Sequence, residues 1–183
     1  MRLAEPIVIR AFCTPVGQPR TKATARAASD GKIITRVYTP STRKTAQGKR
    51  VSIGICEMKD AVRAAVFDLG FTEQLDGPIR CDFLAIFHRH KSKRYKRREW
   101  LSYPHVGRPD LDNIAKGLLD GLTGKEPGHL WANDTQVCIG EWAKIHAARE
   151  TEQILMRVES IDDDADITPV WAQDILCRRT HPS

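Results

Sequence analysis

The chain has 183 residues, of which 41% are hydrophobic and 28% charged, and its formal net charge is +6. This composition predicts one globular domain with a sizeable core, and the positive charge favours an anionic partner such as nucleic acid. The N-terminal segment lacks the apolar core of a signal peptide, and no apolar run is long enough to cross a membrane. A cytoplasmic protein with no membrane partner is therefore expected.

The five cysteines are widely spaced, and none belongs to a C-x-x-C pair. That pattern suggests neither a disulfide framework nor a zinc knuckle, so reduced and mostly buried thiols are expected. The composition changes abruptly after residue 160, and we interpret residues 1–160 as one domain and 161–183 as a tail, acidic and then amphipathic. The tail is either a partly disordered terminus or a short helix that docks on a partner or covers the basic site.

In the N-terminal third, Pro6–Phe12 is rich in Ile and Val and predicts a strand that ends at turn-forming residues. The basic, small-residue stretch Arg20–Lys32 has little with which to build a core, and we expect an exposed arm or flexible loop there. β-Branched residues return in Lys32–Tyr38. This segment is a second strand or the far side of a long hairpin.

Apolar residues recur at helical spacing over Gly54–Leu69 and predict an amphipathic helix with Gly70 as its C-terminal cap. The compact apolar segment Ile79–Phe87 suits a central strand. Asp110–Gly124 predicts a second helix, with one apolar side and with Gly121 and Gly124 marking its fraying end. Two further strands, at residues 137–145 and 153–158, are joined by a short polar turn and predict a hairpin.

The run HRHKSKRYKRR follows the central strand directly. It is either a solvated loop or a phosphate-binding segment in which Tyr95 and Trp100 stack on exposed bases, and the two interpretations are compatible because such loops are solvated until DNA binds. The candidate DNA-binding residues are Arg20, Lys22, Arg89, Lys91, Lys93, Arg94, Lys96, Arg97 and Arg98.

The segment RPDLDNIAKGLLDGLTG contains the residues that indicate chemistry. Asp110 and Asp112 stand at the start of the second helix, where carboxylates could simply cap backbone N–H groups. Lys116 lies one helical turn after Asp112 and projects on the same side. Asp134 stands in a turn before a strand that could return beside the helix, which makes a third carboxylate available.

Oxygen-rich sites of this kind suit Mg²⁺, with Mn²⁺ as a substitute, because these ions bind a few carboxylates together with phosphate oxygens. In phosphodiester hydrolysis such ions activate an attacking water and stabilise charge on the transition state. In a basic protein the aspartates therefore have a chemical purpose. Without a cation they would repel one another and the DNA backbone.

The pattern P-D-L-D-N-x-x-K-x-x-L-D-x-L-T-G, followed by N-D-x-Q-V, resembles the signature of RusA-type crossover junction endodeoxyribonucleases. Upstream, Pro19-Arg20, Lys22 and Tyr38-Thr39-Pro40 resemble the basic N-terminal portion of that family. The resemblance spans roughly residues 6 to 159. It is far more specific than a lone D-x-D.

The resemblance implies a small α/β (α+β) homodimer, with a mixed sheet and two main helices, from a bacterium or phage. It implies a Mg²⁺-dependent endonuclease that resolves four-way (Holliday) DNA junctions by paired symmetric nicks in recombination and repair. By position, Asp110, Asp112 and Asp134 are the essential metal-binding carboxylates and Lys116 the essential lysine. Lys116 suits a role in orienting the scissile phosphate or stabilising its charge.

Two departures from the family pattern concern the third carboxylate. Asn133 stands where family members often have an acidic residue, and it offers a neutral oxygen only. Residues 125–129 also lengthen the loop before Asp134. Asn113, Asp120 and Asn133 are candidates to support the site from a second layer. The histidines at 88, 90, 105 and 129 have no regular metal-binding spacing and are interpreted as loop residues or phosphate contacts.

Two other functions fit the same features. A non-catalytic protein could keep the fold and the basic surface to bind branched DNA, although the intact set of Asp110, Asp112, Lys116 and Asp134 argues against it. A broader nuclease acting on flaps or forks could use the same metal chemistry. Cleavage assays on different DNA structures distinguish the three.

Overall fold

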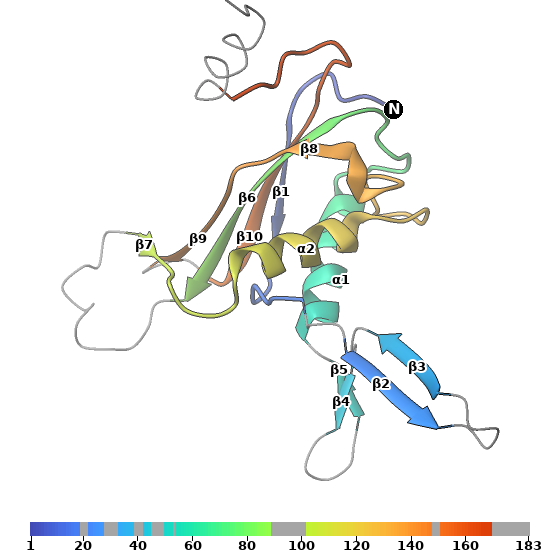
Figure 1. Ribbon diagram of the computed structural model, residues 1–183. Coiled ribbons are helices and arrows are strands. Elements are labelled where there is room, and N and C mark those ends of the chain that lie inside the picture. The colour runs from blue at the N-terminus through green and yellow to red at the C-terminus, as the bar shows by residue number, and fades with distance from the viewer. Residues whose placement is uncertain are drawn as a thin grey trace, which may run out of the picture.

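The computed structural model describes residues 1–18, 54–88, 102–147 and 151–169, together with the backbone of four short strands between residues 22 and 52. Within this part of the chain, six strands form a mixed sheet and two helices pack against it, so the fold is α+β, as predicted (Figure 1). None of the helices described is long and apolar enough to cross a membrane.

Helix α1 spans Gly54–Asp68 and helix α2 spans Leu111–Leu122, which confirms both predicted helices. The strands of the main sheet are β1 (Ile7–Ala11), β6 (Ile79–His88), β7 (Tyr103–Pro104), β8 (Val137–Ile139), β9 (Trp142–Ala147) and β10 (Gln153–Ser160). A 3₁₀ turn, η2 (Asp134–Gln136), precedes β8.

Strand β6 occupies the middle of the sheet, whose order is β1-β10-β6-β9-β7 with β8 also paired to β6. The predicted hairpin between the last two strands is wrong, because β6 lies between β9 and β10. The single strand predicted over residues 137–145 is interrupted at Gly140, where an added Cβ would clash with the Cys81 carbonyl oxygen. The chain therefore forms two strands there, both parallel to β6.

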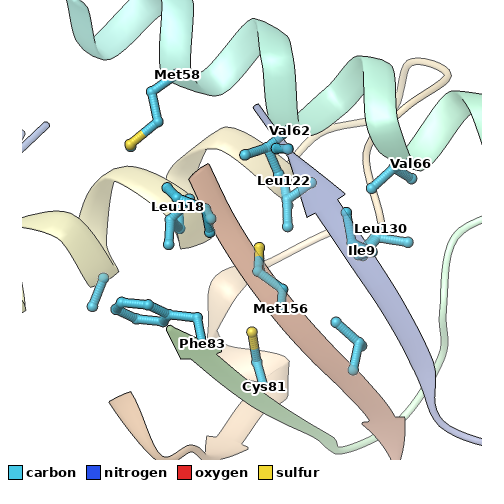
Figure 2. Close-up of a cluster of buried hydrophobic side chains, with 14 of the residues drawn as sticks. Ile9, Met58, Val62, Val66, Cys81, Phe83, Leu118, Leu122, Leu130 and Met156 are labelled. Carbon is cyan, nitrogen blue, oxygen red and sulfur yellow. The ribbon is translucent and has the colours of Figure 1, made fainter. Parts of the chain in front are cut away.

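The core lies between one face of the sheet and the two helices, as Figure 2 shows. Alternate residues of β1, β6 and β10 point into it, including Ile9, Cys81, Phe83 and Met156, because side chains alternate between the two faces of a strand. Helices α1 and α2 supply Met58, Val62, Val66, Leu118 and Leu122.

The two helices approach closely at the glycines of α2. A Cβ added at Gly117 would lie 2.7 Å from Ile55 Cδ1, and one at Gly121 would lie 2.9 Å from Lys59 Cγ. Gly121 is therefore a buried packing residue inside the helix and does not mark its fraying end. The cap prediction for α1 is confirmed by Gly70, whose φ is +81°.

The stretch interpreted as an arm or loop contains strand β2 (Lys22–Ala27), which pairs antiparallel with β3 (Ile33–Tyr38). The loop prediction is therefore wrong for β2, and the hairpin alternative for β3 is confirmed. Alternation of polar residues with alanine in KATARA is compatible with a strand, although alanine contributes little apolar area. Strands β4 (Thr42–Lys44) and β5 (Arg50–Ser52) form a second small pair that sequence reasoning missed.

The second face of the main sheet carries Val8, Leu84 and Leu155, and no described segment covers it. Val8 is 66% exposed. The described part of the tail runs from residue 161 to 169 without helix or strand, and its Asp163 pairs with Arg2 at 2.5 Å. The four described cysteines are reduced thiols, as expected, but of these four only Cys81 is buried, and Cys138 is exposed.

Candidate functional site

The loop before α2 is fixed to strand β9. The His105 N–H donates to the Lys144 carbonyl at 3.1 Å, and the His105 ring stacks on Phe87 with 4.0 Å between ring centroids. The Lys144 ammonium donates to the carbonyl oxygens of Gly107 (2.7 Å) and Pro109 (2.6 Å). These bonds hold the backbone immediately before Asp110 in one position.

Asp110 is the N-cap residue of α2, yet its side chain makes no capping hydrogen bond. The simplest structural explanation for this carboxylate, helix capping, is therefore not what the structure shows. Asp112 lies in the first turn and Lys116 one turn later, and all three side chains are exposed. Two carboxylates and an ammonium group thus share the N-terminal part of α2, where the helix dipole favours negative charge.

The segment that leaves β1 forms the second wall of this region. The Gln18 N–H donates to the Asn113 carbonyl at 2.9 Å, and the Gln18 side chain donates to Asp120 Oδ2 at 2.7 Å. At Gly17 an added Cβ would lie 2.9 Å from Pro109 Cβ and 3.1 Å from Asn113 Cβ. Glycine is required here because the segment lies directly against the start of α2.

A cleft of about 630 Å³ opens between these two walls, with Val16–Gln18 on one side and Arg108–Asp110 and Asn113 on the other. Asp110 thus faces a space large enough for part of a ligand. The residues predicted to bind DNA lie outside the residues whose side chains are described: Arg20, Lys22, Arg89, Lys91, Lys93, Arg94, Lys96, Arg97 and Arg98. Gln18 lines the cleft, and Arg20 is two positions after it in the sequence.

Asp134 lies beyond the C-terminal end of α2. After the helix the chain folds back on itself, and the Leu130 N–H donates to the Leu122 carbonyl at 2.9 Å. The fully buried Trp131 donates its indole N–H to Thr123 Oγ1 at 2.9 Å. Asp134 then follows in η2 and is exposed.

Asn133 and Gln136, the two polar residues near Asp134 that could act as ligands, form structural hydrogen bonds. Asn133 Oδ1 accepts from the Thr135 N–H at 3.1 Å, in a capping box completed by Gln136. The Gln136 amide also donates to the carbonyls of Leu75 (3.1 Å) and Gly77 (3.2 Å). Asn133 is therefore a cap whose side-chain oxygen is already bonded, and Gln136 anchors the turn.

Asp110, Asp112 and Lys116 lie at the N-terminal end of α2, whereas Asp134 lies past its C-terminal end. With 12 residues, α2 is about 18 Å long, and its length separates Asp110 from the chain reversal before Asp134. Among the described residues, no three His, Cys, Asp or Glu side chains form a group that could hold a metal ion. The chain thus holds two of its candidate ligands at one end of α2 and the third beyond the other end.

The remaining candidates have structural partners. Asp120 is bonded to Gln18 and lies 3.9 Å from Lys59 Nζ, so it ties α2 to α1. His129 Nδ1 lies 2.9 Å from the Glu126 carbonyl oxygen, within its own loop. His105 belongs to the aromatic stack, and His90 lies outside the described residues.

Sequence reasoning missed Lys144, Gly17, Gln18 and Gln136, all of which position the site. The role of Lys144 was not predicted because this residue lies within a predicted strand, where a lysine is usually interpreted as facing solvent. The Q of the N-D-x-Q-V motif was a usable signal, since a capping box needs Gln or Glu at that position. Gly17 and Gln18 have no signal in the sequence, because their role depends on a contact with residues about 100 positions away.

The chain has no match among curated proteins. A family model described as endodeoxyribonuclease RusA matches residues 13–158. The match includes both walls of the cleft, helix α2 and the Asp134 turn. Because it covers most of the chain, this protein belongs to the RusA endodeoxyribonuclease family.

Proposed function

We propose that this endonuclease resolves four-way DNA junctions by paired symmetric nicks, as a homodimer that depends on Mg²⁺. Family membership implies an endodeoxyribonuclease that acts on Holliday junctions. The observation that carries the proposal for this chain is the start of α2, where the Asp110 carboxylate is free of capping and shares the helix mouth with Asp112 and Lys116. A cytoplasmic location in a bacterial or phage setting goes with this function.

The donor groups at the helix mouth fit a hard divalent cation. Asp110 and Asp112 offer exposed carboxylate oxygens beside a cleft, and Mg²⁺ binds through one or two carboxylates while keeping waters and substrate phosphate oxygens. When bound, Mg²⁺ supplies an activated water and stabilises negative charge on the phosphate. Asp134 is the third proposed ligand.

Lys116 is proposed to hold the scissile phosphate. Its ammonium group is exposed one turn above Asp112, on the side of α2 where a phosphate bound near both carboxylates would lie. A lysine acts there as a compact positive charge with three donors. It neutralises charge that the phosphate gains as the attacking oxygen approaches.

The basic residues on either side of the described region are proposed to contact the phosphates of the junction arms. The formal charge of +6 attracts DNA, and Arg20 and Lys22 follow directly after the wall of the cleft. The carboxylates at the mouth of α2 would repel a phosphate unless a cation lay between them. Positive charge around the site and a cation within it are therefore complementary requirements.

Cleavage of labelled DNA by Asp112→Asn tests the assignment. Purified protein is offered a four-way junction, a fork, a flap and a linear duplex, with and without Mg²⁺. Wild type is expected to make symmetric nicks in the junction, and Asp112→Asn should lose on the order of 100-fold or more in rate because a charged ligand is lost. Binding to the junction should persist, since the overall fold and the basic segments are unchanged.

The matched control is Asp68→Asn, which neutralises an exposed carboxylate at the far end of α1 and should cut normally. If the wild-type protein binds the junction but cleaves no DNA with any of the divalent metals tried, the non-catalytic alternative is favoured. Equal cutting of forks and flaps would favour the broader nuclease.

A further inference from the structure

The main sheet has a second apolar surface, on the side opposite the two helices. Leu155, Leu84 and Ala143 are lateral neighbours on three adjacent strands, and Val8 lies diagonally across from Leu155. These residues line a hollow of about 430 Å³. We name this surface, defined by Val8, Leu84, Ala143 and Leu155, the open face. A contiguous apolar surface of this kind indicates a contact with another polypeptide segment.

The charged groups around the open face largely neutralise one another. Arg80 pairs with Asp82 at 2.9 Å and with Glu141 at 3.0 Å, and Arg157 pairs with Glu159 at 3.0 Å. A DNA phosphate would therefore meet carboxylates here, in a chain whose net charge is +6. The open face suits an apolar peptide segment better than it suits DNA.

The C-terminal tail contains apolar residues that the endonuclease fold does not use. The family match ends at residue 158, and Val170, Trp171, Ile175 and Leu176 lie beyond it. Trp171 and Ile175 are four positions apart, which places them on one side of a helix. A segment of this length cannot build a core of its own, so its apolar side requires a surface on which to pack.

The tail begins within reach of the open face. Strand β10 ends at Ser160, and the Ile161 N–H donates to the Pro78 carbonyl at 2.9 Å. Asp163 is then held to Arg2 at 2.5 Å. The start of the tail is thus fixed to the end of the sheet.

The next residues turn the chain. The Ala165 N–H donates to the Asp162 carbonyl at 3.0 Å, which closes a turn. The hollow lies beside Leu155 and Arg157 of β10, about 10 to 17 Å along the strand from Ser160. The eight residues from Asp163 to Trp171 can span up to about 26 Å. The tail is therefore long enough to bring Trp171 into the hollow.

We infer that residues 170–177 pack on the open face of the same chain, with the Trp171 indole in the hollow. A cavity of about 150 Å³ is enough for a six-membered aromatic ring, so a hollow of about 430 Å³ accommodates an indole together with a neighbouring aliphatic side chain. Of the positions that the sequence left open for the tail, this one is on the sheet and not over the basic site. The tail then covers apolar side chains that the endonuclease domain alone exposes.

A double-mutant cycle in the full-length chain tests the contact. Urea denaturation is measured for Trp171→Ala, Val8→Ala and the double variant. Trp171→Ala should lower the urea midpoint, because it removes the side chain that fills the hollow. The double variant should lower the midpoint by less than the sum of the two single changes, because neighbouring residues do not contribute independently.

Val106→Ala is the matched control for Val8→Ala. Val106 is 94% exposed in the loop before α2, and its substitution should be additive with Trp171→Ala. An unchanged midpoint in Trp171→Ala, or additivity in both pairs, would overturn the inference.

Cross-linking tests the position of the tail directly. Val8→Cys and Ala172→Cys are combined in a background with Cys138→Ser and Cys177→Ser, and the protein is treated with a short bismaleimide. Mass spectrometry of the digested monomer band should identify a link between positions 8 and 172. The control pair, Val106→Cys with Ala172→Cys, should give much less of its own link.

Two other occupants of the open face are distinguishable. A covalent dimer linked between positions 8 and 172 would show that the tail of a second copy occupies the face. A covalent dimer formed by Val8→Cys alone would show that two sheets pack together there. Either result, or equal yields from the test and control pairs, would overturn the inference. Both experiments are performed without DNA or metal, so their outcome is independent of the proposed function.

Discussion

Lys144 is the residue that joins the sheet to the candidate site. It is only partly exposed, and its ammonium group bonds the carbonyls of Gly107 and Pro109 just before Asp110. Lys144→Met keeps much of the apolar stem but removes both bonds, which costs about 1–3 kcal/mol of stability if the carbonyls lose their partner. We expect junction cleavage to fall about tenfold, because small displacements of reacting groups are costly.

The measurement compares cleavage rate, DNA affinity and urea denaturation of Lys144→Met with those of Lys125→Met, which changes an exposed lysine in the loop after α2. The control should match wild type in all three. If Lys144→Met cuts junctions as fast as wild type while remaining folded, Lys144 does not position the site.

At the scale of single residues, helical spacing was sufficient to place Asp112 and Lys116 together, since residues four apart share one side of a helix. It could not identify Lys144 or Gln18. Their partners, Pro109 and Asn113, are distant in the chain, and only the packing of β9 and the segment after β1 against the start of α2 brings them near.

Among the elements, β6 explains why the predicted hairpin was wrong. Strands β9 and β10 are neighbours in the sequence, but β6 is the more apolar strand and is buried along most of its length. Placing it between the other two covers both of its edges with hydrogen-bonded partners. Sequence periodicity predicts which residues face the core, but it does not predict the order of strands in a sheet.

The aromatic stack at the end of the sheet makes a prediction about pH. Burial, together with the nearby His146 and Lys144, lowers the pKa of His105 from its usual value of 6.5. The folded state then binds fewer protons than the unfolded state, so the contribution to stability is full above about pH 6.5 and is lost as the pH falls toward the lowered pKa. Stability should therefore decline on mild acidification.

His105→Phe keeps a ring that can stack on Phe87 but removes the titrating group. Urea denaturation at a series of pH values should show a shallower acid decline for this variant than for wild type. Identical pH profiles would show that His105 does not contribute to the acid sensitivity of the fold.

For the molecule as a whole, the family signature could be recognised in the sequence because most of its residues lie in one short segment, in and around α2. The separation of Asp134 from Asp112 could not be predicted from the sequence. The sequence left open whether the chain after α2 returns to the start of the helix or reverses at its end. The bond from Leu130 to Leu122 shows that it reverses at the end.

The net charge leads to a final prediction about DNA affinity. Each phosphate contact made by Lys or Arg releases condensed counterions, so the slope of log affinity against log salt changes by roughly 0.9 per contact. Replacing Lys93, Arg94, Lys96 and Arg97 by alanine should reduce that slope by about 3 to 4 if all four contact phosphates. Arg10→Ala with Arg157→Ala removes two exposed charges from the sheet face opposite the helices and should leave the slope unchanged. Fluorescence anisotropy with a labelled junction gives both slopes.

Equal slopes in wild type and the quadruple alanine variant would contradict DNA binding by these four basic residues. A reduced slope in the Arg10→Ala, Arg157→Ala double variant would place the DNA on the sheet instead.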